Sequence, residues 1–167
     1  MKLQRFYIPL LFIISFAASC NKEDNTPSFP ATTILNVSYG SDTAQNFDVY
    51  LPPGRTVTNT KVLIMIHGGG WTSGDKTDYT SFVDTLKRRF PAYAIFNLNY
   101  RLSATPNNLF PTQELDVKEA IEFIYSKANE YRISNKYVLL GASAGAHLAM
   151  LHGYKYNVPI KAKAVVS

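Results

Sequence analysis

A second cysteine is absent from this 167-residue sequence, so Cys20 has no partner for an intramolecular disulfide. A long apolar run is absent too, because the stretch from Phe6 to Phe16 is shorter than the roughly 20 apolar residues that a membrane-spanning helix needs. The sequence also has no long basic tract. Its formal charge is +5, but the basic residues are scattered, and their densest group is Lys87-Arg88-Arg89. These absences argue against a disulfide-stabilised fold, a transmembrane protein and a nucleic-acid-binding protein.

The first twenty residues have the composition of an export signal. Lys2 and Arg5 precede the apolar run, and the small residues Ala17-Ala18-Ser19 lead directly to Cys20. The arrangement resembles a bacterial lipobox, in which the cysteine is lipidated and becomes the mature N-terminus. We therefore predict a lipoprotein signal peptide at 1–19, lipidation of Cys20 and a polar tether at 20–31. The alternative is an ordinary signal peptide with an incidental cysteine.

This N-terminal pattern also predicts a location. A lipidated Cys20 would anchor the protein to the bacterial cell envelope, at the outer membrane. The residues Asn21-Lys22-Glu23-Asp24 resemble the acidic surface-export tags of Bacteroidota lipoproteins, which favours surface exposure, although acidic residues also suit a solvated linker.

Residues 32–167 alternate between strand and helix patterns. The run KVLIMI is continuously apolar, as in a strand buried on both faces of a parallel sheet. Two short strands open the domain without a helix between them, so they should pair antiparallel at one edge. The pattern predicts an α/β fold with a mostly parallel sheet between helical layers. The expected strands are Ile34–Tyr39, Phe47–Leu51, Lys61–Ile66, Ala92–Leu98, Lys136–Leu140 and Lys163–Val166. The expected helices are Tyr79–Phe90, Pro111–Tyr131 and Ala144 to about Gly153.

The segment Gly141-Ala142-Ser143-Ala144-Gly145 lies between a predicted strand and a predicted helix. This is the context of a G-x-S-x-G nucleophile elbow, in which a sharp turn lifts the serine hydroxyl above the sheet. Strand and helix approach closely at such a turn, so its flanking residues must be small, as they are here. The sequence predicts Ser143 as the catalytic nucleophile.

The glycine run His67-Gly68-Gly69-Gly70-Trp71 follows the strand KVLIMI directly. Glycines let backbone N–H groups face a ligand, and an anionic tetrahedral intermediate needs such donors. We predict an oxyanion hole made by the N–H groups of Gly69, Gly70 and Ala144. A phosphate-binding loop is disfavoured, because no G-x-G-x-x-G spacing occurs and no GK[ST] follows.

Together, HGGGW and GASAGAH resemble the bacterial esterases related to hormone-sensitive lipase, including BD-FAE-like acetyl and feruloyl esterases. Tyr100-Arg101-Leu102, Pro111 and Asp116 fall where those families carry YRL, FP and D. The resemblance implies an α/β-hydrolase fold, a Ser–His–Asp triad and ester hydrolysis, with no metal and no organic cofactor. Kynurenine-formamidase-like hydrolases are also similar, because they combine an HGG-x-W loop with G-x-SAGAH.

Several conspicuous side chains have structural interpretations. We expect His67 to shape its loop and His147 and His152 to pack, rather than to act as bases. Trp71 is expected near the acyl pocket. Arg101 and Asp116 are candidates for an ion pair beneath the site, and Asp75-Lys76 is expected to be a solvated turn.

The stretch after Ser143 contains no aspartate and no glutamate. Because the triad of this fold follows the order serine, acid, histidine, the acid and base are expected beyond Ser167. The sequence thus predicts a fragment that is inactive alone, from an envelope hydrolase of small-molecule or polysaccharide-linked esters. A formamidase or peptidase acting on a C–N bond and a non-catalytic, lipid-anchored binding module remain the alternatives.

Overall fold

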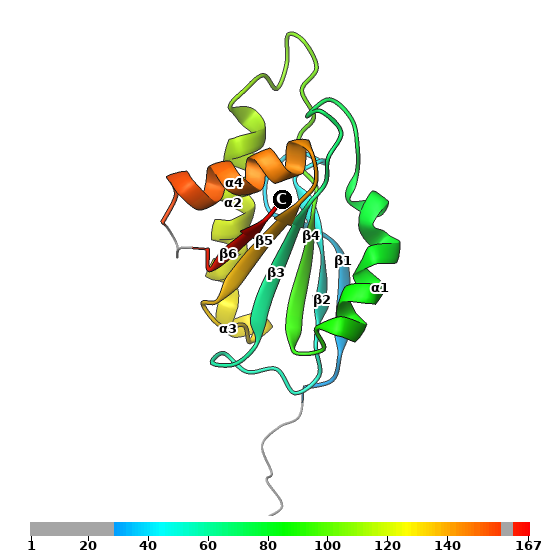
Figure 1. The fold of residues 1–167 in the computed structure, drawn as a ribbon, viewed down its shortest axis with the longest axis vertical. Coiled ribbons are helices and arrows are strands. Elements are labelled where there is room, and N and C mark those ends of the chain that lie inside the picture. Colours follow the sequence, from blue (N-terminus) through cyan, green and yellow to red (C-terminus); the bar gives the residue numbers. More distant parts are fainter. Residues whose placement is uncertain (1–28, 158–161) are drawn as a thin grey trace, which may run out of the picture.

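A six-stranded mixed sheet forms the centre of the protein in the computed structural model, which describes residues 29–157 and 162–167 (Figure 1). The predicted signal peptide and Cys20 lie outside the described residues. The strands are β1 (Thr32–Ser38), β2 (Asn46–Leu51), β3 (Lys61–Ile66), β4 (Tyr93–Leu98), β5 (Tyr137–Gly141) and β6 (Ala164–Val166). The helices are η1 (Lys76–Tyr79), α1 (Thr80–Arg89), α2 (Thr112–Ser126), α3 (Ala128–Tyr131) and α4 (Ala144–Lys155).

The strand order confirms the predicted topology. The order is β1-β2-β4-β3-β5-β6, in which β1 pairs antiparallel with β2 and β2 pairs antiparallel with β4. The remaining pairs, β4 with β3, β3 with β5 and β5 with β6, are parallel. The carboxyl ends of the four parallel strands therefore meet at one edge of the sheet, where ligand sites form in such folds.

Helices cover both faces of the sheet, with α2 and α4 on one side and α1 on the other (Figure 1). Alternate residues of β3 serve the two faces, since successive side chains of a strand point in opposite directions. Ile64 belongs to the same apolar cluster as Ile121 of α2 and Leu148 of α4, whereas Met65 belongs to a second cluster with Leu86 of α1. The unbroken apolar run of β3 is explained by this burial on both sides.

The helix pattern differs from the prediction in two places. The single helix expected to end at Tyr131 is divided at Lys127 into α2 and α3, and Arg132 in the left-handed conformation (φ 53°) ends α3. The helix expected from Tyr79 begins with the 3₁₀ turn η1. None of the helices in the part of the chain that the structure describes is long and apolar enough to cross a membrane.

Candidate active site

Ser143 occupies a strained turn between β5 and α4. Its backbone dihedral angles are φ 53° and ψ −120°, a combination that a residue with a side chain adopts only at a cost of about 1–3 kcal/mol. The residue is exposed, so its hydroxyl faces solvent at the carboxyl edge of the sheet. This is the geometry of the predicted nucleophile elbow.

The elbow depends on a very close approach of α4 to β3. A Cβ atom placed on Gly145 would lie 2.1 Å from the carbonyl oxygen of Ile66 and 2.5 Å from that of His67. Both contacts are with backbone atoms, which cannot rotate away. Only glycine therefore allows the first turn of α4 to sit against the end of β3.

The glycine run after β3 forms a tight loop. Gly69 has φ 108°, and its carbonyl oxygen accepts hydrogen bonds from the N–H groups of Thr72 (3.2 Å) and Ser73 (3.0 Å). The N–H groups of Gly69, Gly70 and Ala144 donate to no other described residue. At Ala144 this follows from its place at the start of α4, since the first N–H groups of a helix have no intrahelical acceptor.

The structure brings the glycine loop and the elbow into contact. A Cβ atom placed on Gly68 would lie 3.4 Å from the Cβ atom of Ser143 and 2.8 Å from the carbonyl oxygen of Ala142. The predicted nucleophile and the predicted oxyanion donors Gly69, Gly70 and Ala144 thus share one small region of the carboxyl edge. Cys20, the predicted lipidation site, lies outside the described residues.

His67 anchors the start of the glycine loop. Its ring is buried (1% exposed) and stacks on the ring of Tyr100 at a centroid distance of 4.3 Å. Its Nδ1 lies 2.7 Å from the carbonyl oxygen of Gly68, so Nδ1 carries the proton, and burial lowers the pKa of the imidazole. A neutral, buried ring turned toward its own loop agrees with the predicted loop-shaping role.

The segment Asp75-Lys76, which follows the glycine loop, differs from the prediction. Asp75-Lys76 was expected to be a solvated turn, but Lys76 is 5% exposed and forms an ion pair with Asp48 of β2. The backbone of Lys76 is held by Asn97 of β4 and by Asn99, which follows the strand: its N–H donates to Asn99 Oδ1 and its carbonyl accepts from Asn97 Nδ2, both at 2.6 Å.

This polar cluster was missed, although the sequence carried a signal for it. Asn97 lies inside an otherwise apolar predicted strand, Ala92–Leu98, and Asn99 follows its end. Buried amides require hydrogen-bond partners, so two asparagines there indicate a second polar segment packed beside β4. Asp75 is part of that segment, because it accepts from Asn99 Nδ2 (2.7 Å) and caps η1.

The ion pair considered for Arg101 and Asp116 is present. The guanidinium binds the carboxylate through Nη2 (2.6 Å) and Nε (3.0 Å), and the Arg101 N–H donates to the same carboxylate at 2.9 Å. Asp116 is fully buried and also accepts from Gln45 Nε2 (3.0 Å). The pair fixes the segment after β4 on α2.

An open pocket of about 240 Å³ lies between the glycine loop and α4. Trp71 and His147 form one wall, with ring centroids 5.4 Å apart in an edge-to-face arrangement. Phe110, which is 69% exposed, and Leu148 add apolar surface. Trp71 lines this pocket and the His147 ring packs on it, whereas the expected position of Trp71 near an acyl group stays a prediction.

The third histidine, His152, packs in the interior, and the described residues contain no metal-binding group. His152 is buried against Tyr137, and burial lowers its pKa to about 4. No group of three or more histidine, cysteine, aspartate or glutamate side chains with metal-binding geometry occurs between residues 29 and 157 or in 162–167.

Known proteins are similar to this chain in sequence. The BD-FAE family model matches residues 47–164. The probable carboxylic ester hydrolase LipM of Mycobacterium tuberculosis is 31% identical over 127 residues, covering 74% of this chain and 29% of LipM. The kynurenine formamidase of Salmo salar is 28% identical over 123 residues, covering 72% of this chain and 38% of that enzyme.

A solved structure is similar to this chain in fold. The truncated form of a carbohydrate esterase from gut microbiota superposes with a TM-score of 0.62 at 28% identity, covering 73% of this chain and 43% of that one. The chain spans about a third of the length of the curated relatives it matches. Because the family model matches well over half of the chain, the chain belongs to the BD-FAE family of α/β-hydrolases.

Proposed function

We propose that the complete protein hydrolyses carboxylic esters through an acyl-enzyme formed on Ser143. The observation that carries the proposal is the contact between the elbow and the glycine loop, measured at 3.4 Å between the Cβ position of Gly68 and Cβ of Ser143. It leaves an exposed hydroxyl beside backbone N–H groups that have no other acceptor among the described residues. A nucleophile next to unused donors is what acyl transfer requires.

The chemistry follows from these positions. The Ser143 oxygen attacks the ester carbonyl carbon while its proton passes to a base, and the carbonyl oxygen becomes an oxyanion. The N–H groups of Gly69, Gly70 and Ala144 donate to that oxyanion, and losing one such donor costs about 3–4 kcal/mol of transition-state stabilisation. Collapse breaks the bond to the alcohol oxygen, which takes the proton, and water then releases the acid by the same steps.

The base and its acid are proposed to follow residue 167. His67 is buried and bonded to its own loop, His147 packs on Trp71, and His152 lies in the interior. No histidine of the described residues is therefore positioned to take the Ser143 proton. The order serine, acid, histidine of α/β-hydrolases places both missing groups later in the chain.

The substrate is proposed to be a small-molecule or polysaccharide-linked ester at the bacterial cell envelope. The pocket beside Trp71 has room for a modest acyl group, and its open side, near the exposed Phe110, leaves space for a larger alcohol. A match to a carbohydrate esterase supports the polysaccharide-linked alternative. The proposed lipid anchor at Cys20 supports the location.

A fluorophosphonate probe tests the nucleophile in the complete gene product. The probe should label the wild-type protein, and Ser143→Ala should remove labelling while the far-ultraviolet circular dichroism spectrum stays the same. Ser81→Ala, at an exposed position of α1, is the matched control and should label fully. Labelling that survives Ser143→Ala would rule out Ser143.

Two alternatives are separated by further assays. A formamidase would cleave an aryl formamide faster than an acetyl or feruloyl ester, and the match to kynurenine formamidase motivates that comparison. A non-catalytic binding module would fold normally but resist the probe at high concentration. In that case the reading frame beyond Ser167 should also lack an aspartate or glutamate followed by a late histidine.

A further inference from the structure

The cations without a carboxylate partner gather at one edge of the sheet. In sequence they are far apart, but the fold brings them to the amino ends of the parallel strands, opposite the active site (Figure 1). We call this surface the basic edge. Within the part of the chain that the structure describes, every lysine and arginine without an ion pair belongs to it: Arg55, Lys61, Arg88, Arg89, Arg132, Lys136 and Lys163.

Backbone contacts show that the lysines of the basic edge are neighbours. Lys61 begins β3, and the N–H of the next residue, Val62, donates to the carbonyl of Lys136 at 2.9 Å. The N–H of Lys163 donates to the carbonyl of Tyr137, which follows Lys136, at 2.8 Å. All three lysines are exposed, so three ammonium groups stand before three adjacent strands.

Carboxylates do not neutralise this surface. Two acidic residues lie on the described helices that contribute to the basic edge, and both are already paired: Glu130 with Lys127 at 3.1 Å and Asp84 with Lys87 at 3.6 Å. The other acidic residues of the described chain lie elsewhere, and several, such as Asp48 and Asp116, are occupied by buried ion pairs. The edge therefore carries a local positive field although the whole chain is only moderately basic.

The chain enters the domain through the same edge. The ring of Phe29 contacts two guanidinium groups, with its centroid 4.3 Å from Cζ of Arg132 and 5.3 Å from Cζ of Arg55. The Phe29 carbonyl accepts from the N–H of Gly54 (2.8 Å), and Arg55 Nη1 donates to the carbonyl of Pro30 (2.5 Å). The end of the predicted tether is thereby fixed to the basic edge.

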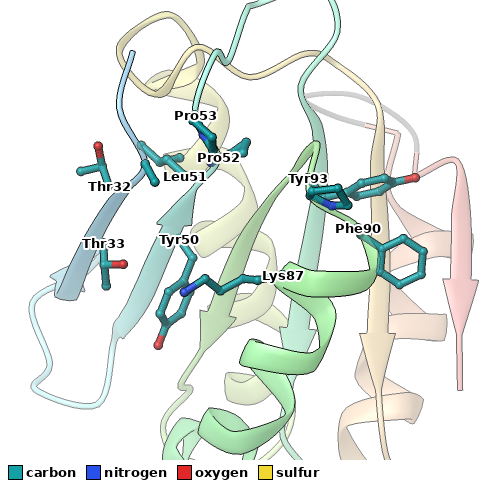
Figure 2. A pocket seen from close by; sticks show the side chains of 11 residues that line it. Thr32, Thr33, Tyr50, Leu51, Pro52, Pro53, Lys87, Phe90 and Tyr93 are labelled. Carbon is teal, nitrogen blue, oxygen red and sulfur yellow. The ribbon is translucent and has the colours of Figure 1, made fainter. Parts of the chain in front are cut away.

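Aromatic rings accompany the charges at this edge. Figure 2 shows Phe90, at the end of α1, beside Tyr93, at the start of β4, and their centroids are 5.5 Å apart. Phe90 is 43% exposed, and Lys61 Nζ lies 5.5 Å from the Tyr93 centroid. Half-exposed aromatic rings among lysines are typical of surfaces that meet lipid headgroups.

We propose that the basic edge docks the domain on the anionic phosphate groups of membrane lipid headgroups, with the active-site edge turned away from the membrane. Phe29 lies nine positions after Cys20, a span of roughly 30 Å at most, so a lipidated Cys20 would hold this edge near the surface. The position of the chain entry favours a membrane over a nucleic acid as the polyanion. The proposal goes beyond ester hydrolysis and does not depend on it.

Vesicle sedimentation tests the docking surface in the absence of lipid modification. The complete gene product is made from Asn21 onward, so neither the signal peptide nor an acyl chain contributes. It should sediment with vesicles of phosphatidylcholine containing about one third phosphatidylglycerol at low salt, and not with pure phosphatidylcholine. Raising the ionic strength toward about 0.5 M should release it, because screening shortens the reach of the field.

Two double variants that remove the same number of charges distinguish an effect of the basic edge from an effect of the net charge. Each lysine near an anionic surface contributes roughly fivefold to partitioning, so Lys61→Gln/Lys136→Gln should weaken binding about 25-fold. The control Lys118→Gln/Lys155→Gln removes the same charge from lysines that already face Glu122 and Glu114, and it should weaken binding less than about threefold. Equal losses in both variants would overturn the proposal.

Two further outcomes would also overturn it. One is the absence of binding to the anionic vesicles at low salt. The other is tighter binding to a DNA duplex than to vesicles at the same concentration of phosphate, which would assign the edge to nucleic acid. Probe labelling of Ser143 should be unchanged in both double variants, so a failure here is distinct from a failure of the proposed esterase activity.

Discussion

Lys76 and Asp48 form an ion pair in the interior, where their side chains are 6% and 8% exposed. Lys76 follows the glycine loop, which begins at the end of β3, and Asp48 lies in β2. Because β4 lies between β2 and β3 in the sheet, the ion pair joins the loop to a strand that is not its direct neighbour. Lys76 Nζ also donates to Asn36 Oδ1 at 2.6 Å. The loop that carries the proposed oxyanion donors is therefore fixed at its far end by buried polar contacts.

Removing one partner of this pair should be costly. In Lys76→Met the carboxylate of Asp48 stays buried without its cation, so we expect the free energy of unfolding to fall by about 3–5 kcal/mol in urea titrations. Asp48→Asn/Lys76→Met removes the uncompensated charge and keeps an acceptor for the Asn36 N–H, so it should recover about 2 kcal/mol of that loss. A loss below about 1 kcal/mol in Lys76→Met would contradict this account.

Gly145→Ala should destabilise the protein, against the usual trend. Alanine inside a helix normally gains up to about 1 kcal/mol over glycine, but here its Cβ would meet the Ile66 carbonyl at 2.1 Å. We expect a loss of at least about 2 kcal/mol in thermal unfolding, together with weaker probe labelling of Ser143.

Gly54→Ala is the matched control for that substitution. Gly54 has φ 62° but no atom within 4 Å of its Cβ position, so only left-handed strain applies, at about 1 kcal/mol. Labelling should be unaffected in this variant. If Gly145→Ala proved as mild as Gly54→Ala, the close approach of α4 to β3 would not be the constraint.

His152 should make the protein less stable in mild acid. Burial lowers its pKa to about 4, from about 6.5 in an unfolded chain, so between these values the unfolded chain binds a proton that the folded chain does not. Its contribution to stability is therefore present above about pH 6.5 and is lost as the pH falls toward 4. Between pH 7 and pH 5 the loss should be roughly 2 kcal/mol.

Urea titrations at both pH values check this. His152→Gln should flatten the pH dependence and leave the smaller part that comes from buried His67. His147→Gln, at an exposed position of the same helix, should leave the pH dependence as it is in the wild type. A steep dependence that persists in His152→Gln would assign it to other groups.

Features with a strong local pattern were predictable from the sequence. The strand Lys61–Ile66 was predicted with its observed bounds, because an apolar run of that length between polar ends has few alternatives. The Ser143 elbow and the glycine loop were predicted because each needs particular small residues at fixed positions. The antiparallel start of the sheet followed from the missing helix between the first two strands.

Features made by contacts distant in sequence were not predictable in the same way. The burial of Lys76 depends on Asp48, Asn36 and Asn99 from three other parts of the chain. The break at Lys127 is a local departure inside a continuous helical pattern. The basic edge likewise could not be predicted from the sequence, because its charged residues are spread over more than a hundred positions.

The strained turn at Ser143 also has a consequence for the reactivity proposed for this residue. Its left-handed backbone is held by the contact of Gly145 with the end of β3, which exists only after strand and helix have met. An unfolded chain carries an ordinary serine with no neighbouring donors. The reactivity proposed for Ser143 is thus coupled to completion of the fold, since it requires a geometry that the unfolded chain does not have.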